Sequence, residues 1–361
     1  MDRSRFYKFF PPPQFLQMPA VGLDISDASM RFVELVETRN GLVIGRFGDR
    51  DIPNGVIVSG EVKKPADLRA VFTDVKKQHN LEYVSVSLPE ERAYLFELKL
   101  PLMKYAEVRG AIELSLEEHV PLHAEEVLFD YEILKEKDAS LHVAVSAVPR
   151  TLVDGYLEAF SGSGITPVAF EIETQSVARA VVPRGDLGSY MIVDFGNLRT
   201  GVTIVSEGAV QFTLTLSVGG VLLTEIIAKN MNISYADAEK VKREKGIVGN
   251  EEHVEHEAAS AALMVPLATL RDEIAKDLTY WQTHDDEYGK KRLPIQKVYL
   301  CGGDSNLVGF VDYLSSGLPV PVELANVFIN ANTLTSYVPS INFDESLRYA
   351  TAIGLALRRP E

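Results

Sequence analysis

Residues 191–205 read MIVDFGNLRTGVTIV, and this stretch decides how we interpret the chain. An apolar run ends in Asp194, a short turn that begins at Gly196 follows, and a second β-rich run comes after Thr200. This pattern predicts a β-hairpin. Because its turn combines a carboxylate with small residues, we expect the turn to contact a ligand.

The same plan occurs earlier, in residues 20–35, AVGLDISDASMRFVEL. Here the apolar run ends in Asp24, a small polar turn runs from Ser26 to Ser29, and a second strand is predicted from Met30. Two aspartate-ended hairpins far apart in one chain indicate a duplicated α/β unit. We expect the ligand to bind between the two halves.

Length and composition narrow the classes of protein to which this chain can belong. The chain has 361 residues, enough for two domains that each bury a sizeable core. Its formal net charge of −15 argues against a broad nucleic-acid surface. The single cysteine, Cys301, excludes an intrachain disulfide and fits a reducing compartment. No apolar run could span a bilayer and no secretion signal is evident, so we expect a cytoplasmic protein.

The chain divides into an arm, two lobes and an inserted domain. Residues 1–18 are basic and aromatic and contain a proline triplet, which predicts an extended arm. This arm either packs on its own domain or docks onto a partner or a membrane surface. The expected domain boundaries are 19–93 for the first lobe, which 171–185 and 340–361 complete, 94–170 for a small inserted domain, and 186–339 for the second lobe with its nucleotide-binding subdomains.

Two further units place a Gly-Gly pair between a strand and a helix, at Gly219–Gly220 and at Gly302–Gly303. Polyphosphate binding requires backbone amides, a cation and carboxylates that hold the cation, and helix N-termini favour anions. Each feature alone is more often an ordinary turn or cap. Their order is the more specific signal: the two aspartate hairpins are followed by the two Gly-Gly units and a closing helix.

This order resembles the actin-like ATPase superfamily. Asp24 to Arg31 look like its first phosphate loop, and Asp194 to Thr200 look like its second. The segment VYLCGGDSNLVGF, at 298–310, is similar to the adenosine motif of that superfamily. VGGVLLTEIIAKN, at 218–230, resembles the element beside the phosphate and ribose, and DAEKVK, at 237–242, resembles the helix beside the purine.

The resemblance implies ATP and Mg²⁺ as cofactors, with Asp24 and Asp194 holding the metal through its waters. Those two aspartates are also the candidate catalytic carboxylates, together with Glu171 and Glu173, which fall near the superfamily's water-positioning residue. Both glutamates could equally be exposed charges at a strand end. The resemblance implies nucleotide contacts from Ser26, Ala28, Ser29, Arg31, Gly196, Asn197, Thr200, Gly219, Gly220, Glu239, Lys242, Gly302 and Gly303.

The first loop departs from the family pattern at three positions. Ser26 stands where glycine is usual, Asp27 where a small neutral residue is usual, and Arg31 where lysine is usual. Arg31 keeps the positive charge. The carboxylate of Asp27 would repel phosphate unless it turned outward or met the cation.

The small domain is similar to the FtsA/PilM branch of the superfamily. Residues 98–134, LKLPLMKYAEVRGAIELSLEEHVPLHAEEVLFDYEIL, match the PilM pattern of a strand, Pro101, a helix and a further strand. FEIETQSVARAV, at 170–181, and YATAIGLALR, at 349–358, resemble the two connecting helices. We therefore expect an actin-like (ribonuclease H-like) two-lobed α/β fold with an FtsA/PilM-type small inserted domain.

The resemblance implies an ATP-binding scaffold of the type IV pilus assembly platform, with at most slow ATPase activity. It would engage the cytoplasmic tail of a PilN-like inner-membrane protein, meet the membrane only through partners, and have the capacity to self-associate. Two alternatives stay open. One is an FtsA-like polymerising cell-division protein, although the sequence ends at 358–361 without the amphipathic tail of that family. The other is a small-molecule kinase on the same fold.

Overall fold

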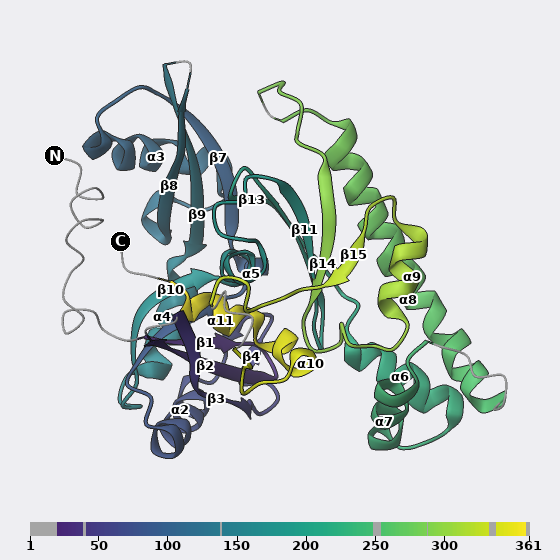
Figure 1. Cartoon of the computed structure of the whole chain (residues 1–361). Coiled ribbons are helices and arrows are strands. Elements are labelled where there is room, and N and C mark those ends of the chain that lie inside the picture. The colour runs from purple at the N-terminus through teal and green to yellow at the C-terminus, as the bar shows by residue number, and fades with distance from the viewer. Residues whose placement is uncertain are drawn as a thin grey trace.

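The computed structural model describes residues 20–38, 41–137, 139–247, 254–286, 288–331 and 337–358. These residues form two lobes, each built on a five-stranded sheet, and a smaller domain beside the first lobe (Figure 1). The first-lobe sheet contains β1 (Val21–Ile25), β2 (Ser29–Thr38), β3 (Gly41–Asp51), β6 (Tyr83–Leu88) and β10 (Thr166–Ile172). The second-lobe sheet contains β11 (Ser189–Phe195), β12 (Thr200–Ser206), β13 (Ala209–Leu216), β14 (Ile295–Cys301) and β15 (Val322–Leu324).

The two sheets have the same topology, which confirms the predicted duplication. Their strand orders are β3-β2-β1-β6-β10 and β13-β12-β11-β14-β15. In each sheet an antiparallel meander of three strands is followed by two strands parallel to the first. Asp24 pairs with Arg31 and Asp194 with Gly201, near the carboxyl end of the central strand of each sheet. Ligands of open α/β sheets bind at such strand ends.

The first-lobe core is built by the sheet and the helices α2 (Pro65–His79) and α4 (Arg150–Phe160). Helix α2 begins with proline at its first turn and ends at Asn80 in the left-handed conformation, the usual signals for the start and end of a helix. Phe72 of α2 stacks on Phe160 of α4 with ring centroids 4.3 Å apart. This contact fastens α4 to the first lobe.

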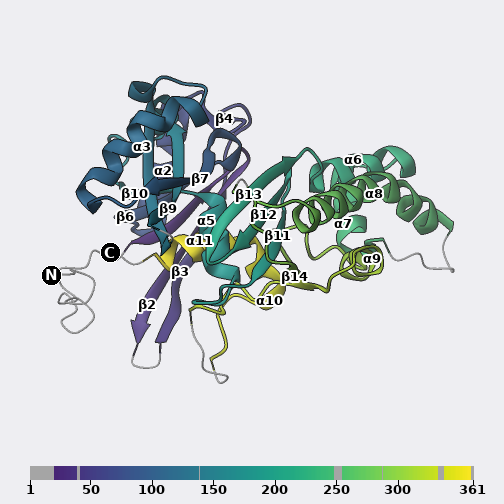
Figure 2. The same ribbon diagram turned by 90° about the horizontal axis from the view of Figure 1, so that it is seen from above.

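Helices α5 (Glu173–Val181) and α11 (Ala350–Ala356) lie against each other between the two sheets (Figures 1 and 2). Their backbones approach closely at Gly354, where an added Cβ would lie 1.8 Å from the carbonyl oxygen of Ser176. The apolar cluster around them draws on both lobes, from Val33 in β2 to Ile192 in β11. These two helices therefore join the lobes.

The small domain has its own sheet and core. It contains β7 (Tyr94–Pro101), α3 (Tyr105–His119), β8 (Val127–Lys137) and β9 (Ser140–Pro149), with strand order β7-β9-β8. Val108, Ile112 and Leu116 of α3 are fully buried in its apolar cluster. The predicted boundary at 170 differs from the structure, because α4 packs in the first-lobe core and β10 pairs with β6.

The second lobe carries four helices beside its sheet, and their apolar faces form one cluster with it. These are α6 (Gly220–Met231), α7 (Tyr235–Lys245), α8 (Val254–Thr283) and α9 (Phe310–Gly317). The short elements are β4 (Ile57–Val58), β5 (Glu61–Val62), η2 (Glu90–Arg92), η3 (Ala124–Glu126), α10 (Phe343–Ser346) and η4 (Leu347–Tyr349).

The predicted arm, residues 1–18, lies outside the residues that the structure describes. Among the helices in the described ranges, none is long and apolar enough to cross a bilayer.

Candidate functional site

One aspartate from each lobe defines the candidate site. Asp24, 7% exposed, accepts a hydrogen bond from the Ser87 hydroxyl at 3.0 Å, and its other oxygen lies 3.8 Å from the guanidinium of Arg31. The same hydroxyl accepts the Ile25 N–H at 2.9 Å, so β6 fixes the end of β1. Asp194 lies near enough for the charge of Asp24 to raise its pKa, so the two predicted metal carboxylates come together.

Burial and mutual repulsion raise the pKa of several carboxyl groups here. Burial, and then the charge of Asp24, raises the pKa of Asp194 to about 7. Burial raises the pKa of Glu173 to about 8, with further contributions from Asp24 and Glu90. The charge of Arg199 lowers the pKa of Glu173 and that of Arg31 lowers the pKa of Asp194, but neither outweighs burial. A low-dielectric site with excess carboxylate charge favours a bound proton or a cation.

The two glutamates predicted near the water-positioning site, Glu171 and Glu173, have different partners in the structure. Glu171 forms an ion pair with Arg179, and Arg179 also donates to the carbonyl of Gly354 at 3.0 Å. Glu171 therefore ties β10 to α5 and α11. Glu173, at the first position of α5, accepts the backbone N–H of Glu90 at 3.2 Å and belongs to the acidic cluster.

Replacing Glu173 with glutamine should change how stability depends on pH. Its pKa is raised from 4.5 to about 8, so the folded protein binds the proton more tightly than the unfolded chain. That stabilisation is complete below about pH 4.5 and is lost as the pH rises towards 8. Glu173→Gln stays neutral, so in EDTA it should nearly equal the wild type at about pH 4 and be more stable by at least about 1 kcal/mol at pH 8.5.

Melting temperatures from about pH 4 to about pH 9 measure this difference. Glu158→Gln, at an exposed position of α4, is the control and should follow the wild type throughout. Parallel curves for Glu173→Gln and the wild type would contradict the raised pKa.

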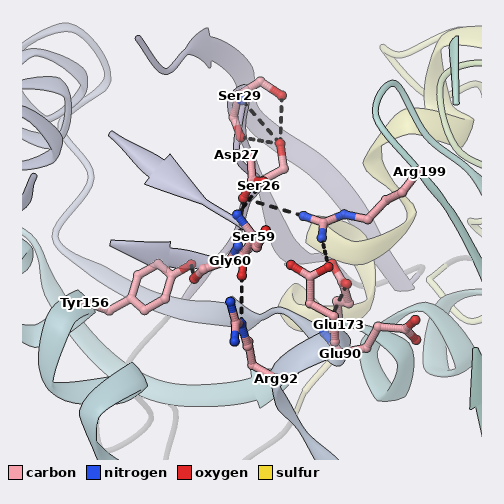
Figure 3. Close-up of polar contacts among 11 residues, drawn as sticks. Ser26, Asp27, Ser29, Ser59, Gly60, Glu90, Arg92, Tyr156, Glu173 and Arg199 are labelled. Atoms are coloured by element: carbon pink, nitrogen blue, oxygen red, sulfur yellow. Dashed lines mark hydrogen bonds and ion pairs between the residues drawn. The ribbon is translucent and has the colours of Figure 1, made fainter. Parts of the chain in front are cut away.

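The first loop forms a tight turn closed by its own side chains. The hydroxyl of Ser26 donates to the carbonyl of Ser29 at 2.9 Å and accepts the Ser29 N–H at 3.2 Å. The carbonyl of Ala28 accepts the Ile52 N–H at 2.9 Å, which fixes the loop to β3. Asp27 turns away from Ser26, towards the turn between β4 and β5 (Figure 3). The Asp27 carboxylate is therefore not turned out to solvent, because the amides of Ser59 and Gly60 and the guanidinium of Arg199 partner it.

The second loop packs onto the start of α6. The Gly220 N–H donates to the carbonyl of Gly196 at 3.1 Å, and the Val221 N–H donates to that of Asn197 at 2.8 Å. An added Cβ at Gly219 would lie 2.5 Å from the backbone of Leu198. The amide of Gly220, one of the predicted phosphate contacts, is thus hydrogen-bonded to the loop, as is that of Val221. The Thr200 hydroxyl donates to the carbonyl of Val218 at 2.6 Å, so it also braces this turn.

The residues predicted beside the ribose and purine form a buried network. Lys242, whose side chain is 3% exposed, contacts Glu239 at 2.9 Å, Asp304 at 2.7 Å and the carbonyl of Gly220 at 3.2 Å. The Thr224 hydroxyl donates to Glu239 at 2.6 Å. Asp304 was not among the site residues predicted from the sequence, although it directly follows Gly302 and Gly303. These residues come from α6, α7 and the loop after β14, as the resemblance implies.

Gly302 and Gly303 differ in their structural roles. Gly302 has φ +92°, and an added Cβ would lie 2.3 Å from a carboxylate oxygen of Asp194. A side chain there would displace the metal-binding candidate. Gly303 has room, since its Cβ would lie 3.7 Å from the Cβ of Arg348. The expected helix N-terminus at this pair is wrong, because α9 begins only at Phe310.

Three charged residues that lie beside Asp24 and Glu173 were not predicted from the sequence. Glu90 and Glu91 belong to η2, directly after β6, and Arg199 lies in the second loop. One oxygen of Glu90 accepts the hydroxyl of Thr215 from the second lobe, and its buried Oε2 has no hydrogen-bond partner in the described residues. The sequence did offer a signal for the two glutamates, since they come directly after Pro89 at the end of an apolar strand.

The fold and the site define an actin-like protein, with two equivalent lobes, two helices between them and an aspartate from each lobe brought close to the other. A chain of the solved "PilM-PilN type IV pilus biogenesis complex" is similar, with a TM-score of 0.77 and 24% identity over 94% of this chain and 98% of that chain. The chain belongs to the family described as type IV pilus assembly protein PilM, whose model matches residues 22–360. The family suggested by the motifs is thereby confirmed.

More distant structures share the fold. The ethanolamine utilization protein EutJ from Carboxydothermus hydrogenoformans has a TM-score of 0.55 at 16% identity, over 95% of this chain and 93% of that chain. MreB5 of Spiroplasma citri bound to ADP has a TM-score of 0.52 at 13% identity, over 92% of this chain and 94% of that chain. These likenesses confirm the predicted actin-like architecture.

Proposed function

We propose that this protein is a cytoplasmic, ATP-binding scaffold of the type IV pilus assembly platform, peripheral to the inner membrane. It engages the cytoplasmic tail of a PilN-like membrane protein. The observation that carries the proposal is the family match over residues 22–360, together with the likeness to a chain of the PilM-PilN complex along nearly its full length. The same findings favour this function over the FtsA-like and kinase alternatives.

The nucleotide part of the proposal is supported by the cleft. Asp24 and Asp194 supply hard oxygen ligands from both lobes. Burial raises the pKa of both groups, and the charge of Asp24 raises that of Asp194 further, so a divalent cation between them would stabilise their charged forms. This donor set fits Mg²⁺ held through its waters. The cation would screen the phosphates from the acidic cluster. Lys242, Glu239 and Asp304 would border the ribose and purine, since they lie together beside Gly220.

The chain's own residues determine how such a nucleotide would be oriented. Ser87 and Arg31 hold the Asp24 carboxylate, and Gly302 leaves room for that of Asp194. Glu173 remains the candidate for positioning a water molecule, because it lies in the cluster with one oxygen anchored by the backbone of Glu90. We propose that the protein hydrolyses bound ATP slowly at most.

The partner part of the proposal assigns the small domain and the adjoining first lobe to peptide docking. The small domain has its own hydrophobic core, so it can be deleted where β7 and β9 enter it. Phe96 of β7 pairs with Val145 of β9, so residues 97–144 can be replaced by an Asn-Gly turn that closes the two strands as a hairpin.

Removal of 97–144 should abolish binding of a synthetic peptide that carries the cytoplasmic tail of the PilN-like protein encoded nearby. Calorimetry measures the peptide affinity, with a scrambled peptide as control. Mg²⁺-dependent ATP binding should remain measurable, which shows that the lobes are folded. Peptide binding by the shortened protein would place the docking site elsewhere. Failure of the full chain to bind the peptide would contradict the proposed partner.

A further inference from the structure

Arg199 extends from the second lobe to the first. It lies in the loop between β11 and β12, and its guanidinium forms ion pairs with two carboxylates of the first lobe (Figure 3). Nη2 lies 3.5 Å from Asp27, in the loop between β1 and β2, and Nη1 contacts Glu91 of η2. The side chains of all three residues are at most 25% exposed, so solvent screens these pairs less than it screens pairs on the surface.

The carboxylate of Asp27 is held rigidly in this position. One oxygen accepts the Ser59 N–H and the other accepts the Gly60 N–H, each at 2.9 Å. Both donors lie in the turn between β4 and β5, where φ is +49° at Ser59 and +75° at Gly60. The Tyr156 hydroxyl donates to the carbonyl of Gly60 at 3.0 Å and fixes the turn to α4. Asp27 is therefore an oriented acceptor for Arg199.

Arg199 also lies among the other acidic groups of the cleft. Its charge lowers the pKa of both Glu90 and Glu173, against the effect of their burial. A guanidinium has five N–H donors in a planar fork, more than the two named pairs require. The residue is placed between Gly196 and Thr200, in the loop that resembles a phosphate loop. It can thus offer donors to a phosphate oxygen from this position.

We propose that Arg199 is a phosphate-binding residue that also latches the lobes, and that Asp27 and Glu91 compete with nucleotide phosphates for its guanidinium. This inference rests on the proposed nucleotide-binding function. The nucleotide contacts that the resemblance implies do not include Arg199, although it lies within the second loop. The latch predicts opposite effects for its two sides: removing the arginine weakens phosphate binding, whereas removing the competing charge at Asp27 strengthens it.

The latch itself can be tested without nucleotide. Spin labels at Lys77→Cys in α2 and Lys240→Cys in α7 report the distance between the lobes, and the native Cys301 is buried and leaves these exposed sites to the label. Arg199→Gln should give a broader distribution with a longer mean distance. Arg92→Gln is the matched control, because the side-chain partners of Arg92 among the described residues belong to the first lobe: the carbonyl of Ser59 at 2.9 Å and Glu61 at 3.1 Å. Equal distributions for Arg199→Gln and the wild type overturn the latch.

The competition is tested by calorimetry with Mg²⁺–ATP and with adenosine, which lacks phosphates. Arg199→Gln should weaken ATP binding about tenfold, and Asp27→Asn should strengthen it about threefold, with adenosine affinity unchanged in both. Arg92→Gln should leave both affinities as in the wild type. Equal losses of ATP and adenosine affinity in Arg199→Gln, or no gain in Asp27→Asn, overturn the phosphate role. A wild type that binds neither ligand instead refutes the proposed nucleotide function, and the distance measurement still decides the latch.

Discussion

Asp194→Asn should weaken Mg²⁺-dependent ATP binding at least about tenfold, which corresponds to about 1.4 kcal/mol. The substitution removes one of the two carboxylates that face the cleft from opposite lobes, and it keeps the shape of the side chain beside Gly302. A cation held between the lobes depends on both charges, so the loss should be largest in excess Mg²⁺ and nearly vanish in EDTA. Calorimetric titrations of ATP at several Mg²⁺ concentrations measure it.

The control for this substitution is Asp74→Asn. Asp74 is a solvent-accessible carboxylate of α2 that pairs with Arg50 of β3, and neither residue is among the predicted site residues. It should leave the titration unchanged. If Asp194→Asn bound ATP as tightly as the wild type, and with the same Mg²⁺ dependence, the assignment of Asp194 as a metal-binding carboxylate would be refuted.

Gly354→Ala should be among the most destabilising single-methyl substitutions in the chain. The added Cβ would lie 1.8 Å from the carbonyl oxygen of Ser176, and backbone cannot move aside as a flexible side chain can. Because α5 and α11 join the lobes, the strain affects both halves. We expect a loss of about 3 kcal/mol and a fall in melting temperature of about 4 °C.

Gly110→Ala is the matched control for Gly354→Ala. Gly110 is also helical, in α3, and nothing lies within 4 Å of its added Cβ. Alanine there should stabilise the protein by about 0.5–1 kcal/mol, since it restricts the unfolded chain without strain. Melting curves at one scan rate compare the variants. If Gly354→Ala melted like Gly110→Ala, the close approach of α5 and α11 would be wrong.

The sequence predicted the duplicated hairpins because their signals are local. An apolar run, an aspartate and a small polar turn fix a strand and its reversal within about fifteen residues. The same locality explains the correct elements of the small domain, where Val108, Ile112 and Leu116 recur at helical spacing and prove to be buried. The boundary at 170 was wrong because α4 and β10 follow the small domain in sequence but belong to the first lobe through pairing and packing.

The contacts across the cleft could not be predicted in this way. Glu171 and Glu173 are two residues apart, yet one pairs with Arg179 and the other joins the acidic cluster. Asp27 appeared as a repulsive departure from the family pattern, and the structure turns it towards the amides of Ser59 and Gly60. Such outcomes depend on partners that are distant in the chain.

By itself, the sequence determined the two aspartate hairpins, the family and the cofactor class to be tested, since strand periodicity and motif order are properties of neighbouring residues. Only the tertiary structure decided which charges face one another. Asp24, Glu90, Glu173 and Asp194 share a cleft because two sheets and two connecting helices bring their strand and helix ends together. Arg199 meets Asp27 and Glu91 for the same reason. Burial at that meeting point raises pKa values and strengthens ion pairs, and no local pattern of residues encodes it.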